Sequence, residues 1–167
     1  MEKQYLFTPD KLNYIIGERP KVDCILCAVV NGDKSVKSLE VHRDKNFIVS
    51  VNLYPYNLGH IIIFPVRHIE DIISFSEEEI IELHNLQIMS IKVIKKLYNA
   101  TSFNIGYNIG EASGASIKHL HLHVVPRYLR EAGFLDILNG CRLIVESPTE
   151  TVRKLKECFA TIINQDS

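Results

Sequence analysis

Three histidines stand at alternate positions in the 167-residue chain, namely His119, His121 and His123. Apolar residues separate them, and alternation with a period of two predicts a half-buried β-strand, because successive side chains leave a strand on opposite faces. The imidazoles are expected on one face of this strand. The opposite face is expected to pack into the core through Leu120, Leu122 and Val124. Near neutral pH an imidazole can act as a nucleophile, a cationic partner of phosphate or a metal ligand. The alternative is one buried histidine beside two solvated neighbours.

Cys24 and Cys27 form a second candidate group. Four cysteines do not make a disulfide scaffold in a chain of this length, and the spacing of this pair is typical of metal ligands. A redox-active pair is the rival interpretation. It requires a thioredoxin-like passage from strand to helix, which we do not expect in this segment.

Length, composition and charge limit the classes of protein to which this chain can belong. A chain of 167 residues with 46% hydrophobic and 23% charged residues is long enough for one well-buried core, so we expect a single domain over residues 1–167. The formal net charge of -1 gives no basic surface for nucleic acid. We find neither a signal-peptide pattern at the start nor an apolar run long enough for a membrane span, and therefore expect a cytoplasmic protein.

The elements that position these residues follow from periodicity, capping and turn residues. Strands are expected at 36–42, 46–52, 60–65, 103–107, 119–126 and 142–146. Helices are expected at 8–17, 76–100 and 149–164, and Ser76 with Glu79 predicts a capping box for the second. The core stripe of that helix is expected to be Ile80, Leu83, Leu86, Met89, Val93 and Leu97. Because several strands follow one another directly, we expect an α+β fold in which an antiparallel sheet carries helices on one face.

The histidine run resembles the defining motif of the histidine triad (HIT) superfamily. Other residues are similar to landmarks of that family, in the family's order, and they are Asn52, Gly59-His60, Pro65-Val66-Arg67-His68, Asn108 and Gly114-Ala115-Ser116. The resemblance covers residues 23–128. It implies a HIT-like antiparallel sheet that pairs with a second copy as a homodimer.

The resemblance also implies a nucleotide hydrolase or transferase that works through a covalent nucleotidyl-histidine. It makes His121 the nucleophile, and a neutral imidazole suits that role because it attacks phosphorus and forms a labile P–N bond. It places His123 where it can donate a hydrogen bond to the phosphate or to the departing group. His60 would orient or assist this pair, and the alternative for His60 is a structural histidine of the core.

Substrate-binding roles come from the same resemblance and fall on Asn52, Asn108, Gly114, Ser116 and Arg127. Asn52 would contact ribose hydroxyls, as in the fragile-histidine-triad hydrolases, whereas Hint-like phosphoramidases usually carry an aspartate. Gly114 and Ser116 would cradle phosphoryl oxygens, Arg127 would neutralise a terminal phosphate, and Asn108 would support the catalytic face. The alternatives are a turn residue for Asn52, a flexible loop for Gly114 and a surface charge for Arg127.

Ala115 bears on the acceptor, because the hydrolase branch has a glutamine at this position. The string Gly114-Ala115-Ser116 is more similar to diadenosine tetraphosphate phosphorylases, in which inorganic phosphate accepts the nucleotidyl group. The resemblance therefore favours phosphorolysis of dinucleoside polyphosphates. A water-using hydrolase of the same substrates and a Hint-like phosphoramidase are the alternatives.

The family resemblance adds two histidines to the cysteine pair as candidate metal ligands. Cys24, Cys27, His68 and His119 resemble the structural zinc site of many bacterial HIT proteins, where two thiolates and two imidazoles form a tetrahedron. We expect one zinc ion per chain, no organic cofactor, and no part for His119 in catalysis.

Two other classes of function stay open at this point. One is an enzyme whose histidine row holds a catalytic metal, although such a site normally includes a nearby carboxylate and none lies in the run. The other is a nucleotide-binding scaffold that forms no histidine adduct.

Overall fold

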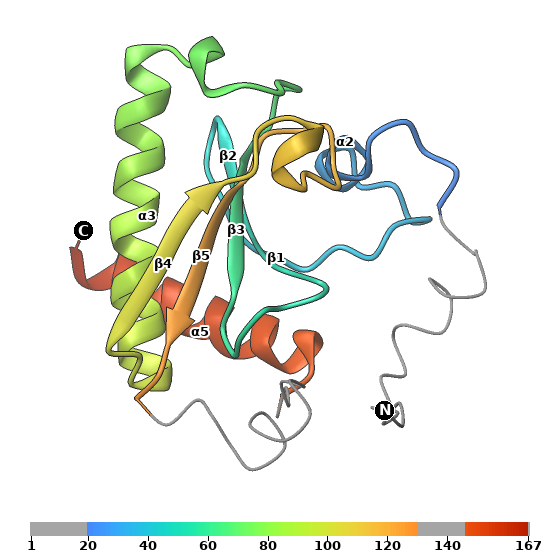
Figure 1. Ribbon diagram of the computed structural model, residues 1–167. Coiled ribbons are helices and arrows are strands. Elements are labelled where there is room, and N and C mark those ends of the chain that lie inside the picture. Colours follow the sequence, from blue (N-terminus) through green and yellow to red (C-terminus); the bar gives the residue numbers. More distant parts are fainter. Residues whose placement is uncertain (1–19, 130–145, 167) are drawn as a thin grey trace, which may run out of the picture.

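The computed structural model describes residues 20–129 and 146–166, and five antiparallel strands form its sheet (Figure 1). The strand order is β1-β2-β3-β5-β4. The strands are β1 (Glu40–Arg43), β2 (Phe47–Val51), β3 (Ile61–Pro65), β4 (Ser102–Tyr107) and β5 (Leu122–Arg127). This arrangement confirms the predicted antiparallel sheet of an α+β fold.

Two long helices, α3 (Glu77–Tyr98) and α5 (Pro148–Asp166), pack on one face of the sheet (Figure 1). The predicted capping box opens α3, since Ser76 accepts from the backbone of Glu79 and the Glu79 side chain accepts from the backbone of Ser76. Most of the predicted stripe of α3 packs into the core. Ile80 does not, because it is 52% exposed. The predicted inward face of α5 is confirmed by buried Leu155, Phe159 and Ile162.

A short helix, α2 (Ile25–Val30), packs against the opposite face and was not predicted. Its Leu26 and Val29 join a second apolar cluster with Ile62 and Phe64 of β3. The expectation that helices cover only one face is therefore wrong. Six residues are too few for helical periodicity to stand out in the sequence. No described helix is long and apolar enough to cross a membrane.

Several strand boundaries differ from the prediction. The first strand begins at Glu40 rather than at residue 36, and a register shift interrupts its pairing between Glu40 and His42. The last described strand begins at Leu122 rather than at residue 119, because Leu120 donates its backbone N–H to Ile69 outside the sheet. The predicted helix 8–17 lies outside the described residues, as does 142–145 of the predicted strand 142–146.

Candidate active site and metal cluster

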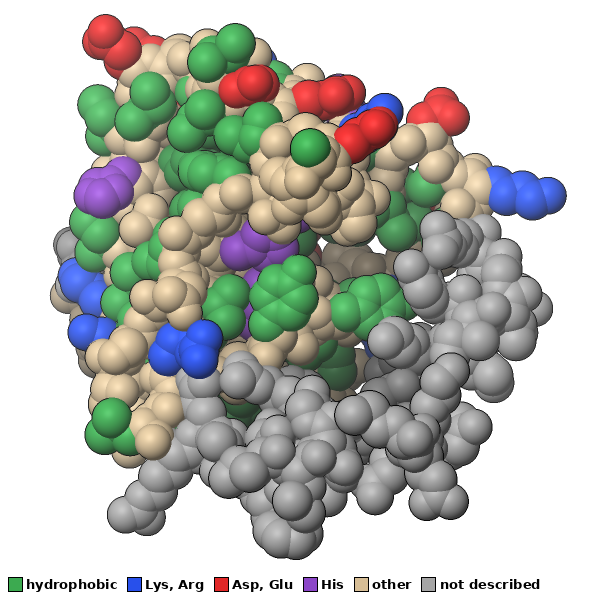
Figure 2. Space-filling model, in the orientation of Figure 1, with side chains coloured by type: hydrophobic (Ala, Val, Ile, Leu, Met, Phe, Trp, Pro, Cys, Tyr) green, Lys and Arg blue, Asp and Glu red, His purple; other side chains and the backbone are tan. Residues whose placement is uncertain are grey.

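Three histidines from two neighbouring strands meet on the sheet. His60 directly precedes β3, His121 directly precedes β5, and His123 lies on β5 opposite Ile62 of β3. Nε2 of His60 lies 3.0 Å from Nδ1 of His123, and the ring centroids of His121 and His123 are 4.8 Å apart. Figure 2 shows histidine side chains at the centre of this face, among hydrophobic neighbours. The pairing of β3 with β5 thus brings the predicted catalytic residues together.

The hydrogen bonds assign the tautomers of His60 and His123. The backbone N–H of Tyr56 donates to Nδ1 of His60 at 3.0 Å, so this nitrogen carries no proton and Nε2 of the neutral ring does. That Nε2–H donates to Nδ1 of His123. The neutral His123 ring therefore carries its own proton on Nε2, which is buried and has no partner among the described residues.

His121 has the opposite tautomer. Its Nδ1 lies 2.8 Å from the backbone carbonyl oxygen of His119, and a carbonyl can only accept, so Nδ1 carries the proton. In the neutral form of this ring, Nε2 of His121 therefore holds a lone pair. Among the described residues no hydrogen bond engages this nitrogen. The site thus combines a basic nitrogen on His121 with a proton donor on His123.

Burial keeps two of these rings neutral. Burial, together with the nearby His123 and His121, lowers the pKa of His60 to about 3. Burial and the nearby His121 lower the pKa of His123 to about 4. At neutral pH both rings are therefore uncharged, as the tautomer assignment requires.

Tyr56 also lies at this site, although the sequence did not predict it as a site residue. Its ring stacks on His60 with centroids 5.0 Å apart and planes 22° apart, and it approaches His123 at 6.0 Å. Asn52 also lies beside His60, with its Nδ2 at 3.3 Å from the ring. The Tyr-Pro-Tyr string before Gly59-His60 indicates a turn, but no spacing rule relates Tyr56 to the histidines.

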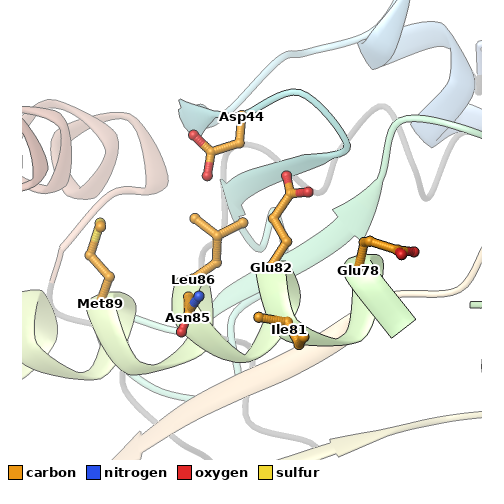
Figure 3. A pocket seen from close by; sticks show the side chains of 7 residues that line it. All are labelled: Asp44, Glu78, Ile81, Glu82, Asn85, Leu86 and Met89. Carbon is orange, nitrogen blue, oxygen red and sulfur yellow. The ribbon is translucent and has the colours of Figure 1, made fainter. Parts of the chain in front are cut away.

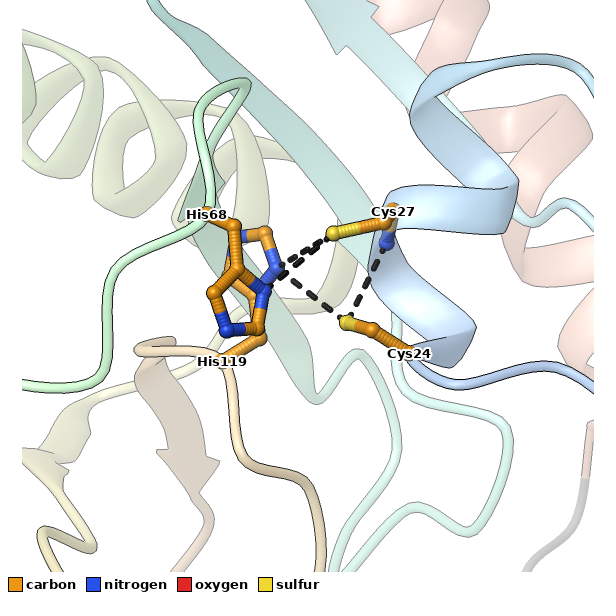
Figure 4. Close-up of side chains that lie close together, drawn as sticks. All are labelled: Cys24, Cys27, His68 and His119. Atoms are coloured by element: carbon orange, nitrogen blue, oxygen red, sulfur yellow. Dashed lines mark hydrogen bonds between the residues drawn. The ribbon is translucent and has the colours of Figure 1, made fainter.

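The four predicted metal ligands converge at the other end of the histidine run (Figure 4). Their ligand atoms all lie within 4.8 Å of one another; the residues are Cys24, Cys27, His68 and His119. Three sulfur-to-nitrogen distances are 3.3, 3.4 and 3.5 Å. In a tetrahedral zinc site with bonds of about 2.3 Å to sulfur and about 2.0 Å to nitrogen, this separation is about 3.5 Å. The cluster can therefore hold a tetrahedral ion.

The surroundings of the cluster also suit a cation. Nε2 of His119 donates to the carbonyl oxygen of Pro65 at 2.9 Å, which leaves Nδ1 unprotonated and directed at both sulfurs. The Glu70 carboxylate lies 3.6 Å from Nε2 of His68. Burial, and to a smaller extent the hydrogen bond and charge of the adjacent Cys24, raise the pKa of Cys27 to about 11. A bound cation would offset these effects and stabilise the thiolate.

The structure revises two arguments made from the sequence. Cys24 is the N-cap of α2, so a helix does follow the cysteine pair, and its absence is no ground against redox chemistry. The two histidine ligands are the stronger argument for metal binding. The histidine row is also divided, since His119 lies with the cysteines whereas His121 and His123 lie with His60. A catalytic metal shared by the whole row does not fit this geometry.

Of the predicted substrate-binding residues, Asn52 contacts the histidine site directly, through the ring of His60. Asn52 also accepts from the backbone of Tyr54, as a turn residue does, at 3.3 Å. Gly114 has a positive φ of 85° and ends a 3-10 turn, where its own N–H already donates to Glu111. Asn108 and exposed Ser116 lie in the same loop between β4 and β5. Arg127 lies four residues beyond His123, about 13 Å along the strand, and donates to Asn104.

A separate hollow of about 390 Å³ lies along α3 and is unrelated to the histidines (Figure 3). Its lining comes from Asp44, Glu78, Ile81, Glu82, Asn85, Leu86 and Met89. Glu82 in this lining accepts two hydrogen bonds from Asn46, so its carboxylate has a structural partner.

Comparison with known proteins identifies the family. The family model described as the HIT domain matches residues 33–129. The chain belongs to the HIT family. A relative, the AP-4-A phosphorylase of Mycobacterium tuberculosis, is 33% identical over 160 residues, which cover 91% of this chain and 82% of that protein.

Solved structures of HIT proteins share the fold. A Zn-bound histidine triad family protein from Mycobacterium smegmatis superposes with a TM-score of 0.71 at 25% identity, covering 86% of this chain and 97% of that one. The diadenosine triphosphate hydrolase of Plasmodium falciparum superposes with a TM-score of 0.61 at 21% identity, covering 77% and 79%. At that identity the second likeness concerns the fold alone.

Proposed function

We propose that this HIT protein cleaves dinucleoside polyphosphates through a covalent nucleotidyl-His121 intermediate. The observation that carries the proposal is the pair of assigned tautomers, with a lone pair on Nε2 of His121 and a proton on Nε2 of His123. The likeness to an AP-4-A phosphorylase supports the class of substrate.

The first step breaks one phosphoanhydride bond. Nε2 of His121 donates its electron pair to the phosphorus atom, and the bridging oxygen leaves with the electrons of the P–O bond. The Nε2–H of His123 donates a hydrogen bond to that oxygen and stabilises its developing charge. The His121 ring becomes positively charged in the adduct, and the backbone carbonyl of His119, which accepts its Nδ1–H, stabilises this charge. His119 thus takes part through its backbone alone, while its side chain lies in the metal cluster.

The second step releases the nucleotide to an acceptor. An oxygen of inorganic phosphate attacks the same phosphorus atom, the P–N bond breaks, and its electrons return to Nε2 of His121. We favour phosphate over water because a small residue, Ala115, stands in the segment proposed to support the phosphates, and because of the likeness to an AP-4-A phosphorylase. Diadenosine tetraphosphate then gives ATP and ADP, whereas attack by water gives ATP and AMP.

The substrate is held by groups on both sides of the histidines. Asn52 binds the ribose hydroxyls, Asn108 and the Gly114 to Ser116 segment support the phosphates, and Arg127 reaches the far end of a long phosphate chain. In the free protein the Arg127 guanidinium donates to Oδ1 of Asn104 at 3.1 Å, and we propose that this bond orients it.

Zinc is the metal proposed for the cluster, because a set of two cysteines and two histidines is typical of structural zinc. When bound, zinc joins α2 to the segment that precedes β5. A similar protein of known structure is described as Zn-bound.

A homodimer is part of the proposal. Strand β4 lies at the edge of the sheet and exposes Ile105, while α3 exposes Ile81 and Ile88. An edge strand flanked by exposed apolar side chains suits pairing with a second copy. Light scattering of the purified chain measures this directly.

Product analysis tests the proposed function. The protein is incubated with diadenosine tetraphosphate, with and without phosphate, and the nucleotides are separated. ADP that forms only with phosphate supports the phosphorylase, and AMP in both reactions favours the hydrolase. If no cleavage occurs in either reaction, the proposed substrate class is wrong.

A further inference from the structure

The ring of Tyr56 covers the hydrogen bond between His60 and His123. Its centroid lies 5.0 Å from that of His60 and 6.0 Å from that of His123. Tyr56 is 59% exposed, whereas His60 is 0% exposed. The ring therefore separates the imidazole pair from solvent on this side.

The loop that carries Tyr56 is fastened to the strand that carries His123. The next residue, buried Asn57, donates from Nδ2 to the carbonyl oxygen of Pro126 on β5 at 2.8 Å. The Tyr128 hydroxyl donates to the carbonyl oxygen of Leu58 at 2.9 Å. Tyr56 itself donates its backbone N–H to His60. The backbone that carries the ring is thus held against the strands of both histidines, and the ring itself stacks on His60.

We propose that Tyr56 is a positioning residue for the reaction at His121, because its ring holds the His60–His123 hydrogen bond in place and excludes water from it. This inference rests on the proposed function. His123 presents a proton on Nε2 only while its Nδ1 accepts from His60. Water that reaches this bond can replace His60, and His123 can then turn or change tautomer.

An exposed aromatic ring beside a nucleotide site has one other use, which is to stack on a nucleobase. The two roles differ in kinetics. Loss of a stacking residue weakens binding and raises KM, whereas loss of a positioning residue lowers kcat and leaves KM nearly unchanged. The 22° angle and the short stacking distance of Tyr56 to His60 favour the positioning role.

Three variants test the inference. Tyr56→Ala removes the ring but keeps the backbone donor, Tyr56→Phe keeps the ring, and Tyr54→Ala removes another exposed tyrosine from the same loop. With diadenosine tetraphosphate, kcat should fall about tenfold or more in Tyr56→Ala, with KM within about twofold. Tyr56→Phe should recover most of the lost kcat. Tyr54→Ala should lower kcat much less than Tyr56→Ala.

A second measurement needs no turnover. Nitrogen chemical shifts of the His123 ring should report one tautomer, with the proton on Nε2, in the wild type, and a mixture in Tyr56→Ala. Unchanged shifts, an effect confined to KM, or an equal loss of kcat in Tyr54→Ala would each overturn the positioning role. Absence of cleavage by the wild type would contradict the proposed function instead, and the chemical shifts would still test Tyr56.

Discussion

The backbone carbonyl oxygen of His119 accepts a hydrogen bond from Nδ1 of His121 at 2.8 Å. The same His119 directs its side chain into the metal cluster and donates from Nε2 to Pro65. One residue therefore connects the metal site to the tautomer and orientation of the proposed nucleophile. We therefore expect a metal bound in the cluster to support the proposed reaction without touching the substrate.

Removal of the metal should therefore affect both stability and turnover. A metal bound only by the folded chain contributes directly to folding free energy, so Cys24→Ser or a strong chelator should lower the melting temperature by roughly 10 °C. Calorimetry with metal analysis measures this. Cys158→Ser is the matched control, because Cys158 lies between α5 and α3, outside the cluster. A metal-free protein that melts at the same temperature as the purified protein would refute the site.

Acid should destabilise the protein through His60. Its folded pKa of about 3 lies below the ordinary value of 6.5, so its contribution is complete above pH 6.5 and is lost as the pH falls towards 3. Between about pH 6 and pH 4 the stability lost through His60 amounts to roughly 2.5 kcal/mol. Denaturant unfolding at several pH values should show a shallower loss of stability in His60→Gln than in the wild type. Parallel curves for the two proteins would contradict the buried neutral histidine.

Gly59 should not tolerate a side chain. Gly59 directly precedes His60 and has a φ of +75°. A Cβ at Gly59 would lie 3.1 Å from the ring of Tyr98. Gly32 is a matched control, since its φ is +68° and a Cβ there meets open space. Both alanine variants incur the strain of positive φ, about 1 kcal/mol, but Gly59→Ala should lose roughly 1–2 kcal/mol more and should lower kcat. Equal unfolding free energies for the two variants would argue against this contact.

More of the candidate site than of the strands and loops around it could be predicted from the sequence. Residue types and spacing indicate the histidine run and the cysteine pair, and the resemblance to the HIT family adds His60 and His68. The structure brings the four predicted ligands together, as it does His60, His121 and His123. The predicted start of β5 was wrong. His119 bonds to Pro65 and Leu120 bonds to Ile69, and these contacts override the local alternation. Tyr56 was missed because its role depends on a stacking contact formed only when the loop folds over His60.

The central claim is covalent catalysis by His121, and trapping the adduct tests it most directly. The protein is mixed with diadenosine tetraphosphate without phosphate, quenched in alkali within one turnover, and digested for mass spectrometry. An adenylyl group is expected on His121 in the wild type and in the control His84→Ala, since His84 is exposed on α3. No adduct is expected in His121→Ala, with turnover reduced about 10³-fold or more and nucleotide binding retained. Turnover by the wild type without adenylyl-His121, or near-normal turnover by His121→Ala, would contradict the account.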